Sequence, residues 1–410
     1  MNNRVLESCG FAVALVMAGC RLAGGAAAGP SSSTSSGNAA GSSSSSSLSN
    51  EGRPRGTPTT LALRQNAPAG IAVDATSVYW LDLGPEHSGP YALGAVRKMG
   101  LNGGTPTTLA SQQPEPSSIT VDATSVYWAS KCEHGAVMKV GLSGGAPTTL
   151  ASEQQNPTGI AVDATSVYWI NGRSDSRNGA VMKVGLSGGT PTTLASEQHS
   201  PVSIAVDATN VYWINRRSDS GNGAVMKVGL SGGAPTTLAT EQNDPRDLAV
   251  DATSVYWTQK IAGTVKEIRY TGHGFETVNT GKRNDNSRAI MKVPLSGGTP
   301  TTLASGDNNP HSIAVDATSV YWLEQASKLI NPPGYLSNTV VIDNNSTVMV
   351  VGLSGGTPTT LAEAQEGARC LAVDSKNVYW TNGGTGAPID DHGLTRWVYN
   401  GYGTVMKVAK

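Results

Sequence analysis

Asp163-Ala-Thr-Ser-Val-Tyr-Trp169 is the stretch that decides the fold, because the chain repeats it. The phrase recurs seven times, identical or nearly so, and its copies end at Trp80, Trp128, Trp169, Trp213, Trp257, Trp322 and Trp380. Successive aspartates of the phrase are 48, 41, 44, 44, 65 and 58 residues apart. A repeat of this period indicates one structural unit used many times, so the unit and its packing against its neighbours define the fold.

Each unit contains four short runs rich in Val, Ile, Thr and aromatic residues. In the clearest copy the runs are 157–163, 167–170, 180–186 and 190–195. Each run is closed by a turn signal, which predicts four β-strands per unit. The Asp-Ala-Thr-Ser turn lets the Asp163 carboxylate accept hydrogen bonds from amides just ahead of it. Ser187-Gly-Gly189 makes the turn between the third and fourth strands, where glycine supplies positive φ.

A four-stranded unit of this length predicts an all-β, seven-bladed β-propeller with four antiparallel strands per blade. A solenoid is the alternative, but it needs atypical capping repeats at its ends. Here the repeat region starts with an isolated fourth strand, 57–62, and finishes with an isolated third strand, 404–408. We therefore expect the N-terminal outer strand to pair with the C-terminal blade, which closes the ring and removes two sheet edges.

Side-chain placement agrees with a blade. The second strand puts Tyr and Trp on opposite faces, so that each blade can contact both neighbours. The fourth strand carries proline at its second position in every copy, which suits an edge strand because the missing N–H is not needed there. These prolines are Pro58, Pro106, Pro147, Pro191, Pro235, Pro300 and Pro358.

The second strand also carries a family resemblance. Tyr-Trp-Thr-Asn at 379–382, Tyr-Trp-Ile-Asn at 168–171 and Tyr-Trp-Leu-Asp at 79–82 resemble the YWTD repeat of receptor propellers. Ile-Ala-Val-Asp followed by Val-Tyr is similar to NHL-type repeats. The resemblance covers residues 57–410. It implies the fold and leaves the function open, because such propellers include ligand-binding receptors, scaffolds, lactonases and lyases. YWTD rings have six blades, so the count of seven leaves the subfamily open.

Residues 1–56 predict export and a tether. Residues 1–20 combine Arg4, an apolar run and Ala18-Gly19-Cys20, which resembles a lipoprotein signal with Cys20 as the lipidated residue. An ordinary cleaved signal is the alternative. Residues 21–56 are mostly Ala, Gly and Ser, a composition that forms a flexible tether. We therefore expect an extracytoplasmic, lipid-anchored or secreted protein whose only contact with the membrane is the lipid.

Composition excludes one class of partner. The net charge is −1 with 14% charged residues, so we expect no binding to nucleic acid. We also expect a monomer without a cofactor or a bound metal. Cys132 and Cys370 fall on blades 2 and 7, so two thiols are favoured over a disulfide, although an oxidising compartment would permit one. The strand-three lysines, such as Lys139 and Lys183, alternate with apolar residues and are interpreted as blade surface.

Variation in length is concentrated on one face. Strands alternate in direction, so the loops between second and third strands share a face, here called the loop face, with the connections between blades. These loops are short in blades 3 and 4, at 171–179 and 215–223, and moderate in blade 1, at 81–94. They are long in blades 5, 6 and 7, at 258–288, 324–346 and 381–403. Blades 5, 6, 7 and 1 are consecutive in the ring, so the long loops form one arc.

The arc also holds the aromatic residues that lie outside both the repeat phrase and the leader. They are Tyr91, Tyr270, Phe275, Tyr335, Trp397, Tyr399 and Tyr402. Aromatic residues with a polar end are typical of recognition surfaces, although long insertions also use them to build small cores. We predict that Trp397, Tyr399 and Tyr402, which lie among glycines, contribute to ligand binding.

A second signal lies at the start of the first strand, beside the central channel. The two positions after the usual proline are small or neutral in blades 1–4. In blades 5–7 they are Arg246-Asp247, His311-Ser312 and Arg369-Cys370. We predict that Arg246, Asp247, His311 and Arg369 contribute polar ligand contacts. Alternatively, they are solvated loop residues.

Other chemistry is weakly indicated. The seven turn aspartates could ring a cation, but turn capping explains all of them. Asp390-Asp391-His392 could bind a divalent ion, although three adjacent residues rarely suffice. The sequence carries no phosphate loop and no Cys-x-x-Cys.

These patterns predict a cell-envelope recognition module that binds a surface protein or a glycan through the loop face of blades 5–7 and 1. The alternative is an enzyme at the channel mouth, as the resemblance to lactonase-like hydrolases and lyases implies. In that case His311 would be the acid/base, and Arg369 or Arg246 would stabilise an anion. A purely structural envelope protein is a third possibility.

Overall fold

The computed structural model describes residues 56–410, except 85–92, 133, 173–178, 217–221, 271–274, 307, 330–339, 384–385, 392–393 and 400–401. Of 260–270, 275–287, 326–329, 340–344, 386–391 and 394–399 it describes the backbone alone. The predicted leader with Cys20, and the predicted tether up to residue 55, lie outside the described residues. Within them, no helix is long and apolar enough to cross a membrane.

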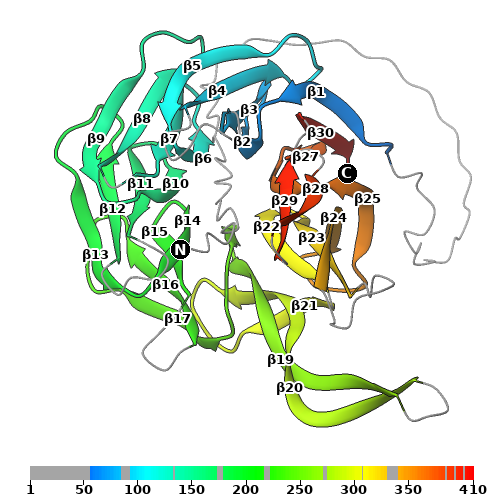
Figure 1. Cartoon of the computed structure of the whole chain (residues 1–410). Helices are drawn as coiled ribbons and strands as arrows, with labels where there is room; N and C mark the ends of the chain where they lie inside the picture. Colours follow the sequence, from blue (N-terminus) through cyan, green and yellow to red (C-terminus); the bar gives the residue numbers. More distant parts are fainter. Residues whose placement is uncertain are drawn as a thin grey trace, which may run out of the picture.

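The described chain forms seven four-stranded antiparallel sheets arranged in a ring (Figure 1). Blade 1 consists of β2 (Pro68–Val73), β3 (Ser77–Asp82), β4 (Leu93–Gly100) and β5 (Thr107–Pro114). Blade 2 consists of β6 (Pro116–Val121), β7 (Ser125–Ser130), β8 (Gly135–Gly141) and β9 (Thr148–Gln154). Blade 3 consists of β10 (Thr158–Val162), β11 (Ser166–Asn171), β12 (Gly179–Gly185) and β13 (Thr192–Gln198). Blade 4 consists of β14 (Pro201–Val206), β15 (Asn210–Asn215), β16 (Gly223–Gly229) and β17 (Thr236–Gln242).

The remaining blades contain the elaborated loops. Blade 5 consists of β18 (Leu248–Val250), β19 (Ser254–Tyr270), β20 (Phe275–Pro294) and β21 (Thr301–Gly306). Blade 6 consists of β22 (Asn309–Val315), β23 (Ser319–Leu329), β24 (Val340–Gly352) and β25 (Thr359–Glu366). Blade 7 consists of β26 (Ala368–Val373), β27 (Asn377–Asn382), β30 (Gly403–Ala409) and β1 (Thr59–Gln65).

Blade 7 closes the ring as predicted. Its outer strand is β1, which pairs antiparallel with β30 through Thr59 opposite Lys407 and Thr60 opposite Met406. The N-terminal strand therefore completes the C-terminal blade, and the all-β, seven-bladed prediction is confirmed. A sheet closed in this way leaves no open seam between the first and last blades.

The insertions continue the blades as hairpins. In blade 5, β19 and β20 stay paired from Ser254 opposite Pro294 to Tyr270 opposite Phe275, and this hairpin extends outward from the ring (Figure 1). β23 and β24 are likewise extended in blade 6. In blade 7 the insertion forms a separate two-stranded sheet of β28 (Gly386–Asp391) and β29 (Leu394–Tyr399).

The core lies between blades. The Trp of each second strand packs with the Tyr of the preceding blade in one of seven apolar clusters. The pairs are Tyr79–Trp128, Tyr127–Trp169, Tyr168–Trp213, Tyr212–Trp257, Tyr256–Trp322, Tyr321–Trp380 and Tyr379–Trp80. All seven Trp side chains are buried, so the opposite-face placement of Tyr and Trp explains how neighbouring blades hold together.

The repeated aspartates cap turns, as expected. Asp163 Oδ1 accepts hydrogen bonds from the amides of Thr165 and Ser166 at 2.7 and 2.8 Å. Its Oδ2 accepts one from Tyr168 Oη at 2.8 Å. Both carboxylate oxygens are therefore occupied within their own turn, which leaves little for a shared cation.

The interpretation of the third-strand lysines as blade surface was wrong. In six blades the Nζ of this lysine donates a hydrogen bond, 2.6–3.0 Å long, to a leucine carbonyl of the next blade. The pairs are Lys98–Leu142, Lys139–Leu186, Lys183–Leu230, Lys227–Leu295, Lys292–Leu353 and Lys407–Leu101. Alternation along one strand does not show that a long side chain can reach a neighbouring blade.

Blade 6 lacks this lysine, because Val350 stands opposite Tyr321 in the corresponding position. Lys410 bridges the junction instead. Its Nζ hydrogen-bonds the Asp316 carboxylate of blade 6 and the Asp374 carbonyl of blade 7, and lies 4.8 Å from the centre of the Tyr321 ring. At the junction between blades 6 and 7, Lys410 near the C-terminus thus takes the place of the third-strand lysine that blade 6 lacks.

Candidate functional site

On the loop face, the junction between blades 3 and 4 shows the regular arrangement with which the other junctions can be compared. Between blades 3 and 4, the indole Nε1 of Trp213 donates to Gln198 Oε1 at 3.0 Å and to Asn215 Oδ1 at 3.1 Å. Asn215 Nδ2 also donates to Gln198 Oε1, at 3.0 Å. A glutamine from the outer strand of one blade therefore fills the space above the tryptophan of the next.

Local backbone geometry delivers that glutamine. Glu197, just before it, has φ of 56°, and the register between β12 and β13 shifts twice near the end of the pair. Gly179 pairs with Gln198, and a Cβ on this glycine would lie 2.4 Å from Pro201 of blade 4. The glycine is required because the next blade approaches its backbone too closely for a side chain.

The junction between blades 5 and 6 departs from this pattern at each of these positions. The residue that pairs as Gly179 does is Arg288, and its partner is Gly306. The register between β20 and β21 shifts once rather than twice. The glutamine position is occupied in the sequence by Asp307, which lies outside the described residues. In blade 6 the positive φ moves to Ser312, at 47°.

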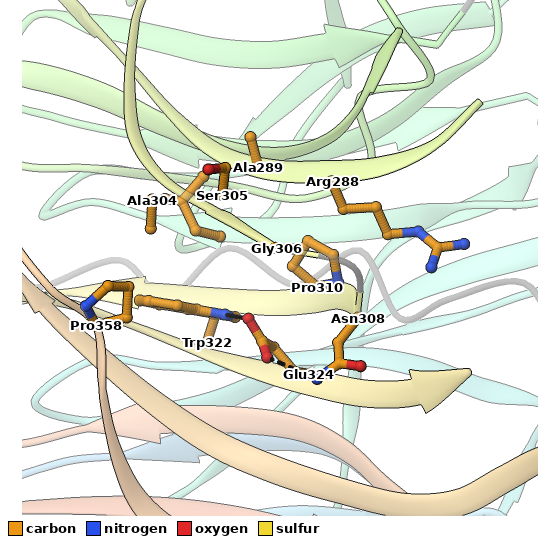
Figure 2. Close-up of a pocket in the computed structure, with 11 residues that line it drawn as sticks. Arg288, Ala289, Ala304, Ser305, Gly306, Asn308, Pro310, Trp322, Glu324 and Pro358 are labelled. Atoms are coloured by element: carbon orange, nitrogen blue, oxygen red, sulfur yellow. Dashed lines mark hydrogen bonds between the residues drawn. The ribbon is translucent and has the colours of Figure 1, made fainter. Parts of the chain in front are cut away.

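A crevice opens at this junction, here called the blade 5–6 cleft (Figure 2). It is narrow, with a cavity volume of about 10 Å³, and its polar lining includes Arg288, Ser305, Asn308 and Glu324. Arg288, from β20, lies on the opposite side of the cleft from Trp322 and Glu324, from β23. Glu324 Oε1 accepts from the Trp322 indole at 2.9 Å, and its Oε2 accepts from Asn308 Nδ2 at 3.2 Å.

A wider groove continues from the cleft over blade 6. It has a volume of about 390 Å³ and shares Asn308 and Glu324 with the cleft. Its further polar lining residues are Asn345, Thr347, Thr360 and Glu363. Carboxylates, amides and hydroxyls therefore line one path along the outer part of the junction.

Two arginines share one aspartate at the connection between blades 4 and 5. Asp244 accepts hydrogen bonds from Arg216 at 2.8 Å on one oxygen and from Arg246 at 2.9 Å on the other. Burial raises the pKa of Asp244, but Arg246 and Arg216 outweigh it and hold the value at about 2. Burial lowers the pKa of the nearby Arg288, and the positive charge of Arg246 lowers it further.

Asp247, predicted at the channel mouth, is inside the wall. Its side chain is 1% exposed and joins three blades. Oδ1 accepts from Ser203 Oγ of blade 4 at 2.6 Å, and Oδ2 accepts from the Ile313 amide of blade 6 at 3.1 Å. The structure thus separates Asp247 from its neighbour Arg246, which stays half-buried at the surface.

His311 is half-buried and directed at the next blade. Its Nε2 lies 3.1 Å from the Ala368 carbonyl, and its Nδ1 lies 3.3 Å from the Asn309 carbonyl. Burial lowers the pKa of His311, and although these carbonyls oppose the shift, Arg246 adds to it. Both ring nitrogens therefore face backbone carbonyls, and a neutral imidazole donates a hydrogen bond to one of the two.

The remaining residues predicted for the site or for a disulfide are found at separate places in the structure. Arg369 is half-buried, and its guanidinium lies over the backbone of Gly383, where a Cβ would be 2.5 Å from Nε. Cys370 is buried and Cys132 half-buried, and they do not form a disulfide with each other. Tyr402 is 66% exposed. The side chains of Trp397, Tyr399, Asp390 and Asp391, and His392 altogether, lie outside the described residues.

Sequence reasoning pointed to Arg246 and His311, neither of which lines the blade 5–6 cleft, and it did not find Arg288, Asn308 or Glu324, which do. A signal for Arg288 was available, because the third strand begins with glycine in blades 1–4 and 7, and blade 5 has arginine there. Asn308 and Glu324 gave no comparable signal, because the residue two places after Trp is polar in every blade.

Comparison with known proteins supports the fold. No family model and no curated protein matches the chain. The WD40 β-propeller domain of Doa1 is similar with a TM-score of 0.55 and 11% identity, over 87% of this chain and 97% of that one. Oligogalacturonate lyase in complex with manganese gives 0.48 and 12%, over 87% and 98%. A structure of a nidogen/laminin complex gives 0.43 and 17%, over 70% and 88%. At these identities the likeness shows a β-propeller and no more.

Proposed function

We propose that this protein is a recognition module of the cell envelope that binds a surface protein or a glycan through the loop face of blades 5, 6, 7 and 1. The observation that carries the proposal is the blade 5–6 junction. There the repeat lacks the glutamine and the glycine found at the junction between blades 3 and 4, and it has a cleft lined by Arg288, Asn308 and Glu324. Clefts with convergent polar groups are typical of ligand sites.

The surrounding surface fits the same role. The long insertions of blades 5, 6 and 7 rise on this face, and the exposed Tyr402 belongs to it. Arg369 and the aromatic residues Trp397 and Tyr399 would add contacts to the same ligand. The lipid anchor on Cys20 and the tether over 21–56 belong to the proposal as well, since a flexible tether lets the ring turn its loop face outward.

Binding is better supported than catalysis. The enzymatic alternative needs His311 to exchange a proton with a substrate, and both of its ring nitrogens contact backbone carbonyls. An acid/base must reach the reacting group within hydrogen-bonding distance. Arg246 is likewise committed to Asp244 through Nε and one terminal nitrogen.

A pull-down from the native envelope fraction tests the proposal. One variant carries the blade 3 loop, 172–178, in place of 260–287, 325–345 and 383–402. A matched control carries the same loop in blade 2, in place of 131–134. We expect the parent and the control to retain the same partner and the arc variant, folded by circular dichroism, to lose it. Equal capture by all three proteins, or capture of nothing by the parent, would overturn the proposal.

A further inference from the structure

The closure of the ring repeats the polar set that is found at other junctions. β1 of blade 7 supplies Gln65, and β3 of blade 1 supplies Trp80 and Asp82, 15 and 17 residues later. The same spacing holds at the junction between blades 3 and 4, whose members are Gln198, Trp213 and Asn215. Gln65 Nε2 donates to the carbonyl two residues earlier at 2.6 Å, as Gln198 Nε2 does at 2.7 Å. The two glutamines therefore hold their Oε1 atoms in the same orientation.

Asp82 changes the chemistry of this set, because an ionised aspartate has no hydrogen to donate. At three junctions an asparagine Nδ2 donates to the glutamine Oε1 of the preceding blade at 2.8–3.3 Å, in the pairs Asn171–Gln154, Asn215–Gln198 and Asn382–Gln365. At the ring closure, Gln65 Oε1 is buried and accepts no hydrogen bond from any described residue. Gln65 and Asp82 are only 4% and 6% exposed, so an acceptor without a donor is costly here.

A second substitution in blade 1 provides a partner for the ionised carboxylate. Arg97 stands opposite Trp80, at the position that methionine occupies in the other six blades. Its Nε lies 3.4 Å from Asp82 Oδ2, while Asp82 Oδ1 accepts from Trp80 Nε1 at 3.1 Å. Because these contacts come from β3 and β4, the ionised form of Asp82 is bound within its own blade.

Asp82 changes its protonation state in mild acid. Burial raises the pKa of its carboxyl to about 6, although Arg97 and the Trp80 indole act in the opposite direction. Of the strands packed against β3, β2 and β6 contain no titratable residue. Glu86 and His87, in the loop after β3, lie outside the described residues. The other cations of β4, β1 and β30 are Lys98 and Lys407, each bonded to a leucine carbonyl, and the exposed Arg64.

We propose that Asp82 is a proton-dependent switch at the closure of the ring. In its ionised form it pairs with Arg97 inside blade 1. After it takes a proton from solvent, its carboxyl O–H donates to Gln65 Oε1, as Asn215 Nδ2 donates to Gln198 Oε1. This bond joins blade 1 to the strand that completes blade 7, so the ring closes more firmly in mild acid. The switch goes beyond the proposed recognition function and does not depend on it.

Urea unfolding of the full chain at pH 7 and pH 5 tests the switch. A carboxyl with a raised folded-state pKa binds its proton more tightly in the folded protein. Its contribution to stability is therefore complete below pH 3.8 and is lost as the pH rises through about 6. Asp82→Asn, which introduces the residue of blades 3, 4 and 7, is the reference. Relative to it, the unfolding equilibrium constant of the parent should be about tenfold smaller at pH 5 than at pH 7.

Matched glutamine variants test the acceptor. Gln65→Ala removes it at the ring closure and should raise the unfolding equilibrium constant about fivefold more at pH 5 than at pH 7. Gln198→Ala is the control and should have the same effect at both pH values, because Asn215 does not titrate. Hydrogen exchange gives a local measurement. After correction for intrinsic rates, exchange of the β1 amides relative to those of β13 should slow about fivefold at pH 5 in the parent, and not in Asp82→Asn.

The inference fails if the parent and Asp82→Asn respond alike to the change from pH 7 to pH 5. It also fails if Gln65→Ala has the same effect at both pH values, since the carboxyl would then titrate without bonding β1. An equal pH dependence for Gln198→Ala, or β1 amides that do not slow relative to those of β13, would likewise overturn a switch at the ring closure. None of these results bears on whether the loop face binds a partner.

Discussion

Two junctions of the ring, between blades 3 and 4 and between blades 5 and 6, each contain a buried tryptophan of the repeat. They differ in the polar residues that contact its indole N–H. At the first, Gln198 and Asn215 close the space over Trp213. At the second, Trp322 bonds Glu324 beside an open cleft. The comparison teaches that the Tyr–Trp packing sets the ring, whereas the ends of the strands on the loop face can change without disturbing it.

The largest effect on the free energy of unfolding should come from replacing the tryptophans of these two junctions, Trp213 and Trp322. Removing a buried tryptophan side chain costs about 3–5 kcal/mol through lost apolar burial and the cavity that remains. We expect Trp213→Ala to lower the free energy of unfolding in urea by about 1 kcal/mol more than Trp322→Ala. The one indole N–H of Trp213 is shared by two acceptors in a closed site, whereas Glu324, the acceptor of Trp322, keeps Asn308 as a donor beside the cleft. An equal loss, or a larger one for Trp322→Ala, would contradict the distinction between closed and open junctions.

The glycines at the two junctions should respond in opposite directions. A Cβ at Gly179 would lie 2.4 Å from Pro201, so Gly179→Ala should lower the free energy of unfolding by about 1–3 kcal/mol. A Cβ at Gly306 would meet nothing within 4 Å, so Gly306→Ala should raise it by about 0.5 kcal/mol through the unfolded chain. Urea unfolding measures both, and a loss at Gly306 as large as that at Gly179 would show that blade 6 approaches this edge as closely as blade 4 approaches its neighbour.

The smaller effect concerns the lysine that crosses the junction between blades 6 and 7. Lys410→Met should lower the free energy of unfolding by about 1–2 kcal/mol at pH 7, because it removes a partly buried ion pair with Asp316. Adding Val350→Lys should restore part of the loss, since it places lysine opposite Tyr321 as in the other six blades. No rescue would show that Lys410 does not replace the missing lysine.

The same pair predicts a pH dependence. Burial raises the pKa of Asp316, but the hydrogen bond from Lys410 and the amides of Thr318 and Ser319 bring it to about 2, below its ordinary 3.8. A carboxyl with a depressed folded-state pKa contributes stability above pH 3.8 and loses it as the pH falls toward 2. Lys410→Met should therefore flatten the stability curve over this range, and an unchanged curve in an acid titration would exclude the pair as its source.

Individual elements show why the fold was predictable and the site only in part. Residues 163–169 contain both the aspartate that caps the turn and the Tyr and Trp that face opposite sides of the strand. Each copy therefore predicts a strand pair from local sequence alone. The contact of Lys139 with Leu186 was missed because it joins residues 47 apart. Asp247 was predicted at the channel mouth because it follows Arg246, but just before β18 the side chain of Asp247 is buried between blades while that of Arg246 stays half-buried.

The sequence by itself determined the number of blades, the closure of the ring through β1 and the face that carries the insertions, because these depend on local periodicity and on counting repeats. Only the tertiary structure decided which polar residues share a site. Arg288 and Glu324 come from β20 and β23 of neighbouring blades and line one cleft, where β21 ends at Gly306 without the second register shift that precedes Gln198 in blade 3. That bulge is a property of paired strands, and a linear pattern does not record it.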